Sequence, residues 1–156
     1  MYKNPNRQPK MQLTEIDDLH TLLRFVESYH RYESLAFDKK AVTATLSTLI
    51  AAKELGRIWL IKMNNSPVGY LALCFGYSIE FLGHDAFIDE FYLDPAYRNR
   101  GIGRRVLNWL GDEAPKLGLK AIHLEVARNN HHARYLYETS GFKSRGDFQF
   151  MSRAVS

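Results

Sequence analysis

The sequence predicts an α/β (α+β) fold in which one mixed central β-sheet is flanked by helices on both faces. Helix-like and strand-like hydrophobic periodicities alternate along the chain. Three strand-like segments joined by short connections favour an antiparallel meander, and a long amphipathic helix followed by another strand favours a crossover. A meander and a crossover together make the sheet mixed, and its apolar faces need helices to cover them.

Two helices are predicted before the sheet. Thr14 has the chemistry of an N-cap, with Asp17 three residues later, and apolar residues recur at helical spacing up to about Tyr32. Asp38 is predicted to cap a second helix, which Gly56 would end. The apolar positions are Ile16, Leu19, Leu23 and Val26 in the first helix, and Val42, Leu46, Leu49 and Ile50 in the second.

Three strands are predicted next, because β-branched and aromatic residues dominate residues 57–63, 68–77 and 86–93. Residues 64–67 have the composition of a turn, and residues 78–85 are expected to form a loop.

Helix and strand alternate in the rest of the chain. A long amphipathic helix is predicted to end at Gly118, followed by a strand over 120–126, a short helix over 130–140 and a final strand within 142–153. The apolar stripe of the long helix consists of Ile102, Val106, Leu110 and Ala114.

Residues 1–156 are predicted to form a single domain, since this length and the 46% apolar content are ordinary for one globular unit. Residues 1–10 are polar and are expected to form a flexible arm. The single cysteine, Cys74, excludes a disulfide framework and is typical of a reducing compartment. No secretory signal or membrane-spanning segment is recognisable, so we expect a cytoplasmic protein with no membrane partner.

Residues 93–105 carry the strongest functional signal. A strand ends there, a tight loop contains Gly101 and Gly103, and a helix begins. The N–H groups of a helix start bind anions, and the glycines let a phosphate approach them closely. Arginine side chains add charged donors, although they could merely face solvent. The arginines are Arg98, Arg100, Arg104 and Arg105.

Two common phosphate motifs do not fit this segment. A dinucleotide fingerprint would need a third glycine in place of Val106, and a P-loop would need Lys and Ser/Thr in place of Arg104 and Arg105. A nucleic-acid groove is also disfavoured, since a net charge of +4 is small and the basic cluster lacks interleaved aromatic residues.

Residues 98–103, R-N-R-G-I-G, resemble the (Q/R)-x-x-G-x-(G/A) signature with which the GNAT superfamily of acyl-CoA-dependent N-acetyltransferases binds the coenzyme A pyrophosphate. The preceding residues 91–98 are similar to that family's strand and loop, and residues 125–142 match its E-V-x-x-x-N-x-x-A-x-x-L-Y-x-x-x-G-F pattern. The resemblance covers about residues 58–151. It implies the GNAT fold and transfer of an acetyl group from acetyl-CoA to a primary amine, by direct attack in a ternary complex without a metal.

The resemblance also implies which residues bind acetyl-CoA. The backbone around Leu93 would pair with the pantetheine amides, the backbone of residues 98–104 would bind the pyrophosphate, and Asn130 would contact the coenzyme arm. Arg105 is a further candidate for a phosphate contact. The implied cosubstrate-binding residues are Tyr92, Leu93, Arg98, Asn99, Arg100, Gly101, Ile102, Gly103, Arg104 and Asn130.

Three residues are predicted to act in catalysis. Tyr137 lies where many family members place the acid that protonates the departing thiolate, and the alternative is a packed helix aromatic. Asp89 and Glu90 are adjacent in a predicted strand, so their side chains should point to opposite faces. We expect Asp89 to be the base that deprotonates the amine, with Glu90 as the alternative or as a charge that binds the acceptor.

Other candidates are weaker. Cys74 lies in an apolar strand and is expected to be a core residue, and the adjacent His131 and His132 have a spacing that suits no metal. Residues near the first helix, namely Tyr29, His30, Tyr32 and Glu33, could line the acceptor pocket or simply pack. The expected partner is a small-molecule or peptide amine, and a homodimer is left open. The alternative is a non-catalytic acyl-CoA-binding domain of the same fold.

Overall fold

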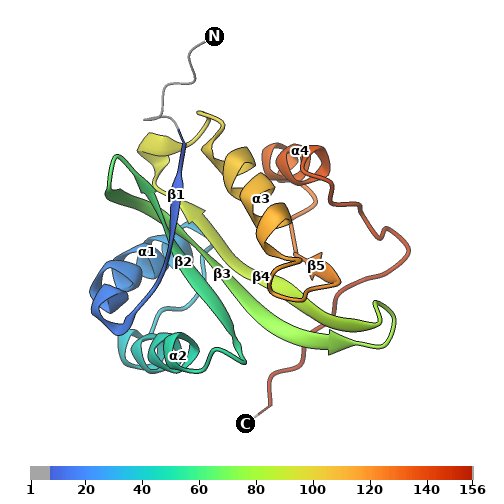
Figure 1. Cartoon of the computed structure of the whole chain (residues 1–156), viewed down its shortest axis with the longest axis horizontal. Helices are drawn as coiled ribbons and strands as arrows, with labels where there is room; N and C mark the ends of the chain where they lie inside the picture. Colours follow the sequence, from blue (N-terminus) through green and yellow to red (C-terminus); the bar gives the residue numbers. More distant parts are fainter. Residues whose placement is uncertain (1–7, 156) are drawn as a thin grey trace. The chain divides into compact units, whose positions relative to one another are not determined.

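The computed structural model describes residues 8–155 (Figure 1). Contacts within the chain define two compact units, which divide after Glu125, and each is described here by itself. The first unit contains the β-sheet and the helices α1 (Leu19–Tyr32), α2 (Lys39–Ala51) and α3 (Ile102–Glu113). The second contains α4 (His131–Thr139). Short 3₁₀ turns precede α1 and α3, at Ile16–Asp18 and Pro95–Tyr97.

The sheet has five strands in the order β1-β2-β3-β4-β5, the same order in space as in sequence. The first four strands are antiparallel to their neighbours, and β5 pairs with β4 in parallel across the α3 crossover. This arrangement confirms the predicted mixed sheet. The strands are β1 (Lys10–Leu13), β2 (Gly56–Met63), β3 (Ser66–Ser78), β4 (Gly83–Leu93) and β5 (Ala121–His123).

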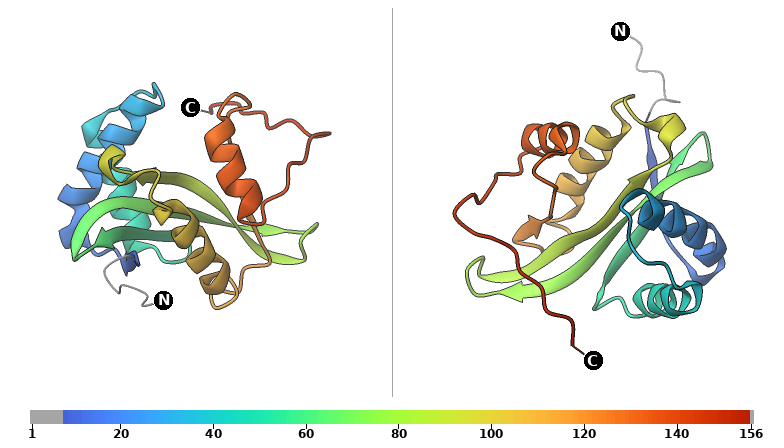
Figure 2. Two further views of the ribbon diagram at one scale, coloured as in Figure 1. Left: turned by 90° about the horizontal axis from the view of Figure 1, so that it is seen from above. Right: turned by 180° about the vertical axis from the view of Figure 1, so that it is seen from behind.

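Helices cover both faces of the sheet in the first unit (Figure 2), as predicted. Alternate residues of β2 point to opposite faces. Ile58 and Leu60 are buried in the cluster formed with α1 and α2. Trp59 points the other way, where its ring meets Trp109 of α3 edge-on at 5.2 Å between centroids.

An aromatic core fills the space between α1 and the sheet. The rings of Phe25, Tyr70 and Tyr92 lie 6.0–6.4 Å apart, and all three residues are buried. Leu22 and Val26 of α1 are buried in the same cluster. The predicted stripe is therefore only partly right, because Leu19 and Leu23 are partly buried and Ile16 is exposed.

The predictions for the N-terminal segment were partly wrong. Residues 1–7 of the expected arm lie outside the described residues, but Lys10 belongs to β1, where it pairs with Lys62. Thr14 is not an N-cap, because its N–H and hydroxyl both donate to the carbonyl of Ile58, each at 3.0 Å. Glu15 caps the first 3₁₀ turn instead. A four-residue strand is too short to show a periodicity, so the sequence contained no signal for β1.

Several boundaries also differ from the predictions. Half of the expected loop over 78–85 is strand, because β3 continues to Ser78 and β4 starts at Gly83. The strand expected over 120–126 is shorter, and residues 142–153 form no strand within the described part of the second unit. The long helix ends at Glu113, before Gly118. Asp38, by contrast, caps α2 as predicted, with its carboxylate accepting from the Ala41 N–H at 3.0 Å.

Candidate active site

The end of β4 has one open edge within the described residues. β5 pairs only with Asp85–Phe87, so the later residues of β4 have a single ladder, with β3. The N–H of Asp94 donates to the Val68 carbonyl at 2.8 Å, which shows which N–H groups of β4 point toward β3. Because strand residues alternate, the N–H groups of Phe91 and Leu93 point away from β3, toward the open edge.

A β-bulge lies just before this open edge. Ala72 of β3 pairs with Glu90, but its neighbour Leu73 pairs with Ile88, so Asp89 is an extra residue without a partner. Cross-strand partners share a face, and Ala72 and Leu73 face opposite ways. The bulge therefore places Ile88 and Glu90 on opposite faces of the sheet and turns Glu90 toward α1.

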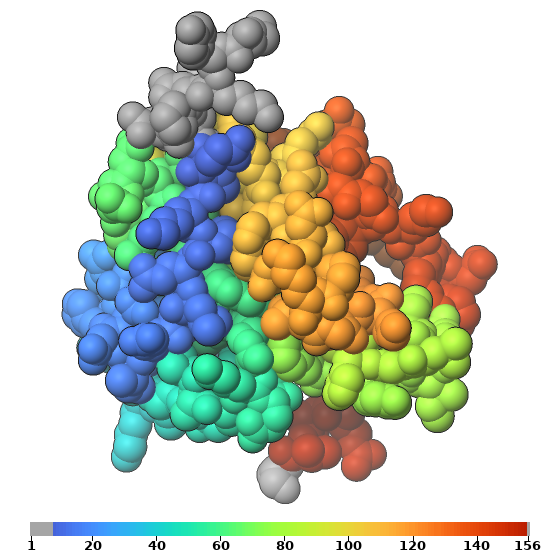
Figure 3. Space-filling view, viewed as in Figure 1, coloured from blue at the N-terminus to red at the C-terminus, as the bar shows by residue number. Residues whose placement is uncertain are grey.

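The 98–104 loop follows the Pro95–Tyr97 turn after the open edge and includes the first residues of α3. Asn99 and Gly101 adopt left-handed backbone conformations, with φ of 59° and 73°. Gly101 is the N-cap of α3, and no side chain caps this helix. The N–H groups of Ile102 and Gly103 in its first turn are thus placed to bind an anion. Figure 3 shows the segment that contains this helix start at the molecular surface.

Arg98 is anchored inside the protein rather than extended into solvent. Its Nε donates to the Leu93 carbonyl at 2.8 Å, and its guanidinium lies 4.8 Å and 5.3 Å from the ring centroids of Tyr32 and Tyr92. Arg105 also turns back, donating to the Arg100 carbonyl at 3.3–3.4 Å. These contacts tie both arginines to the backbone and rings of the chain itself.

Glu90 lies at the centre of a hydrogen-bonded cluster between α1 and the sheet. Its Oε1 is 2.7 Å from Nε2 of His30, and its Oε2 accepts from the Tyr70 hydroxyl at 2.6 Å. The other ring nitrogen of His30, Nδ1, lies 3.0 Å from the Ala36 carbonyl. The side chains of His30 and Glu90 are 15% and 17% exposed, so this network is largely shielded from water.

This environment changes several pKa values. Burial and the neighbouring Glu90 carboxylate raise the pKa of the Tyr70 hydroxyl, which therefore stays a donor. Partial loss of hydration raises the pKa of Asp89, and His30 partly opposes this shift, although Asp89 itself reaches solvent. Burial, with Asp89 and Glu90 nearby, raises the pKa of Cys74 to about 11. A thiol with that pKa is protonated at neutral pH and is a poor nucleophile.

The second unit holds the remaining predicted site residues. Asn130 caps α4, where its side-chain oxygen accepts from the Ala133 N–H at 3.1 Å. Tyr137 is half-buried, and its ring meets Phe142 edge-on at 5.8 Å. The roles predicted for Asn130 and Tyr137 remain predictions. His131 and His132 are exposed, and no set of three metal-ligating side chains occurs among residues 8–155.

The residues expected near the acceptor divide into two groups. As described above, His30 contacts Glu90, and Tyr32 contacts Arg98. The ring of Tyr29 lies against the rings of His30 and Tyr92, at centroid distances of 5.9 Å and 6.4 Å. Glu33 is exposed at the end of α1. Tyr70 was not predicted. The one sequence feature that could have identified Tyr70 as a site residue is its hydroxyl within an apolar strand, because a buried phenol needs a hydrogen-bond partner.

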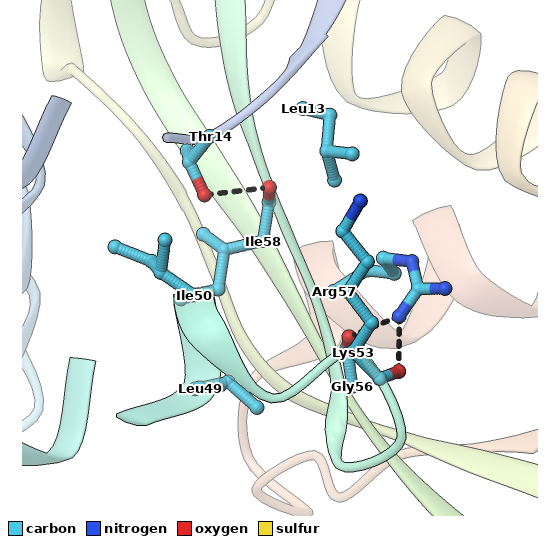
Figure 4. A pocket seen from close by; sticks show the side chains of 8 residues that line it. All are labelled: Leu13, Thr14, Leu49, Ile50, Lys53, Gly56, Arg57 and Ile58. Carbon is cyan, nitrogen blue, oxygen red and sulfur yellow. Dashed lines mark hydrogen bonds between the residues drawn. The ribbon is translucent and has the colours of Figure 1, made fainter. Parts of the chain in front are cut away.

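A small pocket lies elsewhere, between α2, the end of β1 and the start of β2 (Figure 4). Arg57 donates across it to the carbonyl groups of Lys53 and Gly56. Gly56 pairs with Cys74, whereas Leu93 pairs with Gly69, so the pocket lies toward the other end of β3 from the open edge. Its lining residues are Leu13, Thr14, Leu49, Ile50, Lys53, Gly56, Arg57 and Ile58.

Comparison with known proteins agrees with this geometry. Residues 17–142 match the model of the acetyltransferase (GNAT) family. An uncharacterized N-acetyltransferase of Methanocaldococcus jannaschii is 27% identical over 131 residues, which are 83% of this chain and 58% of that protein. The spermine/spermidine N(1)-acetyltransferase of Bacillus subtilis is 33% identical over 70 residues, 44% of this chain and 46% of that protein. The chain spans about half the length of these curated relatives.

A solved structure shows the same fold. The crystal structure of a predicted acetyltransferase with acetyl-CoA from Clostridium acetobutylicum matches with a TM-score of 0.75 and 19% identity, covering 93% of this chain and 96% of that one. Within the described residues, no helix is long and apolar enough to cross a membrane. The family model covers most of the chain, and the open strand edge and uncapped helix start lie inside the matched region. The chain therefore belongs to the GNAT acetyltransferase family.

Proposed function

We propose that this chain transfers an acetyl group from acetyl-CoA to a primary amine by direct attack in a ternary complex. One observation carries the proposal: the open edge of β4 leads, through the Pro95–Tyr97 turn, into the 98–104 loop and the uncapped start of α3. A strand edge offers hydrogen bonds to the amides of pantetheine, and a helix start offers them to a pyrophosphate. Both parts of coenzyme A thus find matching groups on one continuous segment.

The cosubstrate would bind mainly through the backbone. Phe91 and Leu93 would pair with the pantetheine arm, and the first N–H groups of α3 would bind the pyrophosphate. The charge of the arginines would attract the phosphates, with Arg100 and Arg104 exposed at the loop. Asn130 would donate its side-chain amide to the coenzyme arm, because capping α4 uses only its oxygen.

The reaction requires two proton movements. The amine nitrogen attacks the thioester carbonyl carbon, the new C–N bond forms, and the C–S bond breaks to release a thiolate. The nitrogen loses its proton to a base, and the thiolate gains one from an acid. N–H groups on the open edge would stabilise the negative oxygen that forms during attack. Tyr137 would supply the proton to the thiolate.

Asp89 is the better candidate for the base. It reaches solvent in the bulge, and its raised pKa brings the carboxylate closer to the range in which a base works near neutral pH. Glu90 is less suitable, because both of its oxygens are already engaged in hydrogen bonds with His30 and Tyr70. Hydrogen bonds to a carboxylate stabilise its charge and make it a weaker base.

We infer that the acceptor is a small cationic amine. The acidic pair Asp89 and Glu90 lies beside the open edge and would favour a positively charged ligand. A polyamine fits this description, and a Bacillus subtilis relative is named for spermine and spermidine. A peptide amine is the alternative, since an Escherichia coli relative is named for the alanine of ribosomal protein bS18.

Two measurements on the full chain test this function. Calorimetry should show binding of coenzyme A, and a thiol-release assay with acetyl-CoA should show turnover with at least one amine from a panel. The panel contains spermidine, an aminoglycoside, lysine and a peptide with an N-terminal alanine. Binding without thiol release for every amine would indicate a non-catalytic acyl-CoA-binding domain instead.

A further inference from the structure

We propose that His30 is a positioning residue for acyl transfer, which fixes Glu90 and thereby the bulge that presents Asp89. The inference rests on the proposed function. It assigns different tasks to the two adjacent carboxylates, with Glu90 held in place by its neighbours and Asp89 left to meet the amine. His30 would act through Glu90 and would not touch the substrate.

The hydrogen bonds determine which protons the cluster holds. A backbone carbonyl can only accept, so Nδ1 of His30 donates its proton to Ala36 at 3.0 Å. The 2.7 Å contact between Nε2 and Oε1 of Glu90 then holds a second proton. Both ring nitrogens are therefore engaged, which leaves His30 without a free nitrogen to serve as a base.

The second oxygen of Glu90 is held equally firmly. Tyr70 is fully buried, and its hydroxyl donates to Oε2 at 2.6 Å. Its raised pKa keeps the proton on the phenol. Glu90 thus accepts one hydrogen bond at each oxygen, from α1 on one side and from β3 on the other, and has little freedom to rotate.

Fixing Glu90 also fixes Asp89, because the two residues share a peptide bond. A bulged residue lacks a ladder partner, so its backbone depends on its neighbours for a defined conformation. The Glu90 side chain attaches the residue after the bulge to α1 and β3 at the same time. A shift of about 1 Å in a catalytic group can slow a reaction on the order of 100-fold.

His30 makes a second, separable contact. Through Nδ1 it holds Ala36 in the segment between α1 and α2, and the ring of Phe37 packs edge-on against it at 5.9 Å. Loss of His30 could therefore act through Glu90 or through this segment. Two substitutions separate these effects. In His30→Gln the new amide nitrogen would lie near the place of Nε2, and in His30→Asn it would lie near the place of Nδ1.

The test compares His30→Gln, His30→Asn and His30→Ala, using the amine of the panel that wild type acetylates fastest. We expect His30→Ala and His30→Asn to lower kcat by about 10- to 100-fold. His30→Gln should recover most of that loss, because it can still donate to Glu90. The affinity for coenzyme A should stay at the wild-type value in all three variants. His20→Gln is the matched control, since His20 is exposed near the start of the same helix.

Each outcome has one interpretation. If wild type releases no thiol with any amine, the proposed function fails, and this inference fails with it. If wild type is active and His30→Asn matches or exceeds His30→Gln, the segment at Ala36 is what matters, and the role of Glu90 is refuted. Wild-type kcat in all His30 variants would refute it as well. Should the His30 variants not fold, Tyr70→Phe provides the same test from the other oxygen, with an expected loss in kcat and unchanged coenzyme A affinity.

Discussion

Replacing Tyr70 with Phe tests the buried carboxylate cluster by removing a single hydroxyl. The ring would keep its contacts with Phe25 and Tyr92, so the packing of the core should be preserved. The lost interaction is a 2.6 Å hydrogen bond to a carboxylate, and such bonds contribute about 1.5–3 kcal/mol. The Glu90 side chain is 17% exposed, so water can replace part of the lost hydrogen bond. We therefore expect a loss of about 2 kcal/mol in the free energy of unfolding.

Thermal and urea denaturation measure this loss directly. For a chain of this length, about 2 kcal/mol corresponds to a fall in Tm of about 4–8 °C. A double-mutant cycle with Glu90→Gln should give a coupling energy above about 0.5 kcal/mol, as for residues in direct contact. Tyr77→Phe is the control, because that side chain is 73% exposed and should change stability by less than about 0.5 kcal/mol. A Tyr70→Phe loss as small as that of the control, without coupling, would refute the reasoning.

Four further predictions concern the reaction. Gly101→Val with Gly103→Val should abolish coenzyme A binding in calorimetry while circular dichroism shows a folded protein, and unchanged affinity would exclude the helix start as the pyrophosphate site. Asp89→Asn should reduce the rate most at low pH, with partial recovery as rising pH deprotonates the free amine. The folded state raises the pKa of Asp89, so ionising this carboxyl group costs stability. The variant should therefore have a higher Tm than wild type at pH values above that pKa, and an equal Tm at acid pH, where Asp89 is protonated in both states. A flat ratio of rates across pH would count against Asp89 as base. Cys74→Ala should keep most of its activity, with no acetyl-cysteine in mass spectra, because a thiol of pKa about 11 is not the nucleophile. Tyr137→Phe should slow single-turnover transfer by about 10²- to 10⁴-fold at unchanged coenzyme A affinity, and a wild-type rate would mean that water delivers the proton.

The central sheet and the 98–104 loop could be predicted because their signals are local. Strand alternation in β2 sends Ile58 and Trp59 to opposite faces, and the glycines of the loop mark both the turn and the helix start. In each case the residues that carry the signal are neighbours in the sequence.

The arrangement of the acidic pair could not be predicted. Regular alternation predicts that Asp89 and Glu90 face opposite ways, but it cannot show that Asp89 is an extra residue in the ladder. That fact depends on β3, whose pairing register no local pattern reveals. The contact between His30 and Glu90 joins residues 60 positions apart, so it too depends on tertiary structure. β1 was missed because it becomes a strand only by pairing with β2.

The bulge at Asp89 has a consequence for self-association. An open strand edge is a template on which another chain can pair, and proteins often interrupt such edges with bulges or charges. Here the ladder is interrupted at Asp89, so only a short regular stretch up to Leu93 remains open to an added strand. The extra residue with its carboxylate thus protects the edge from intermolecular pairing while leaving room for a narrow ligand. Deleting it would restore a regular edge, leave the other side chains of β4 on their present faces, and favour aggregation.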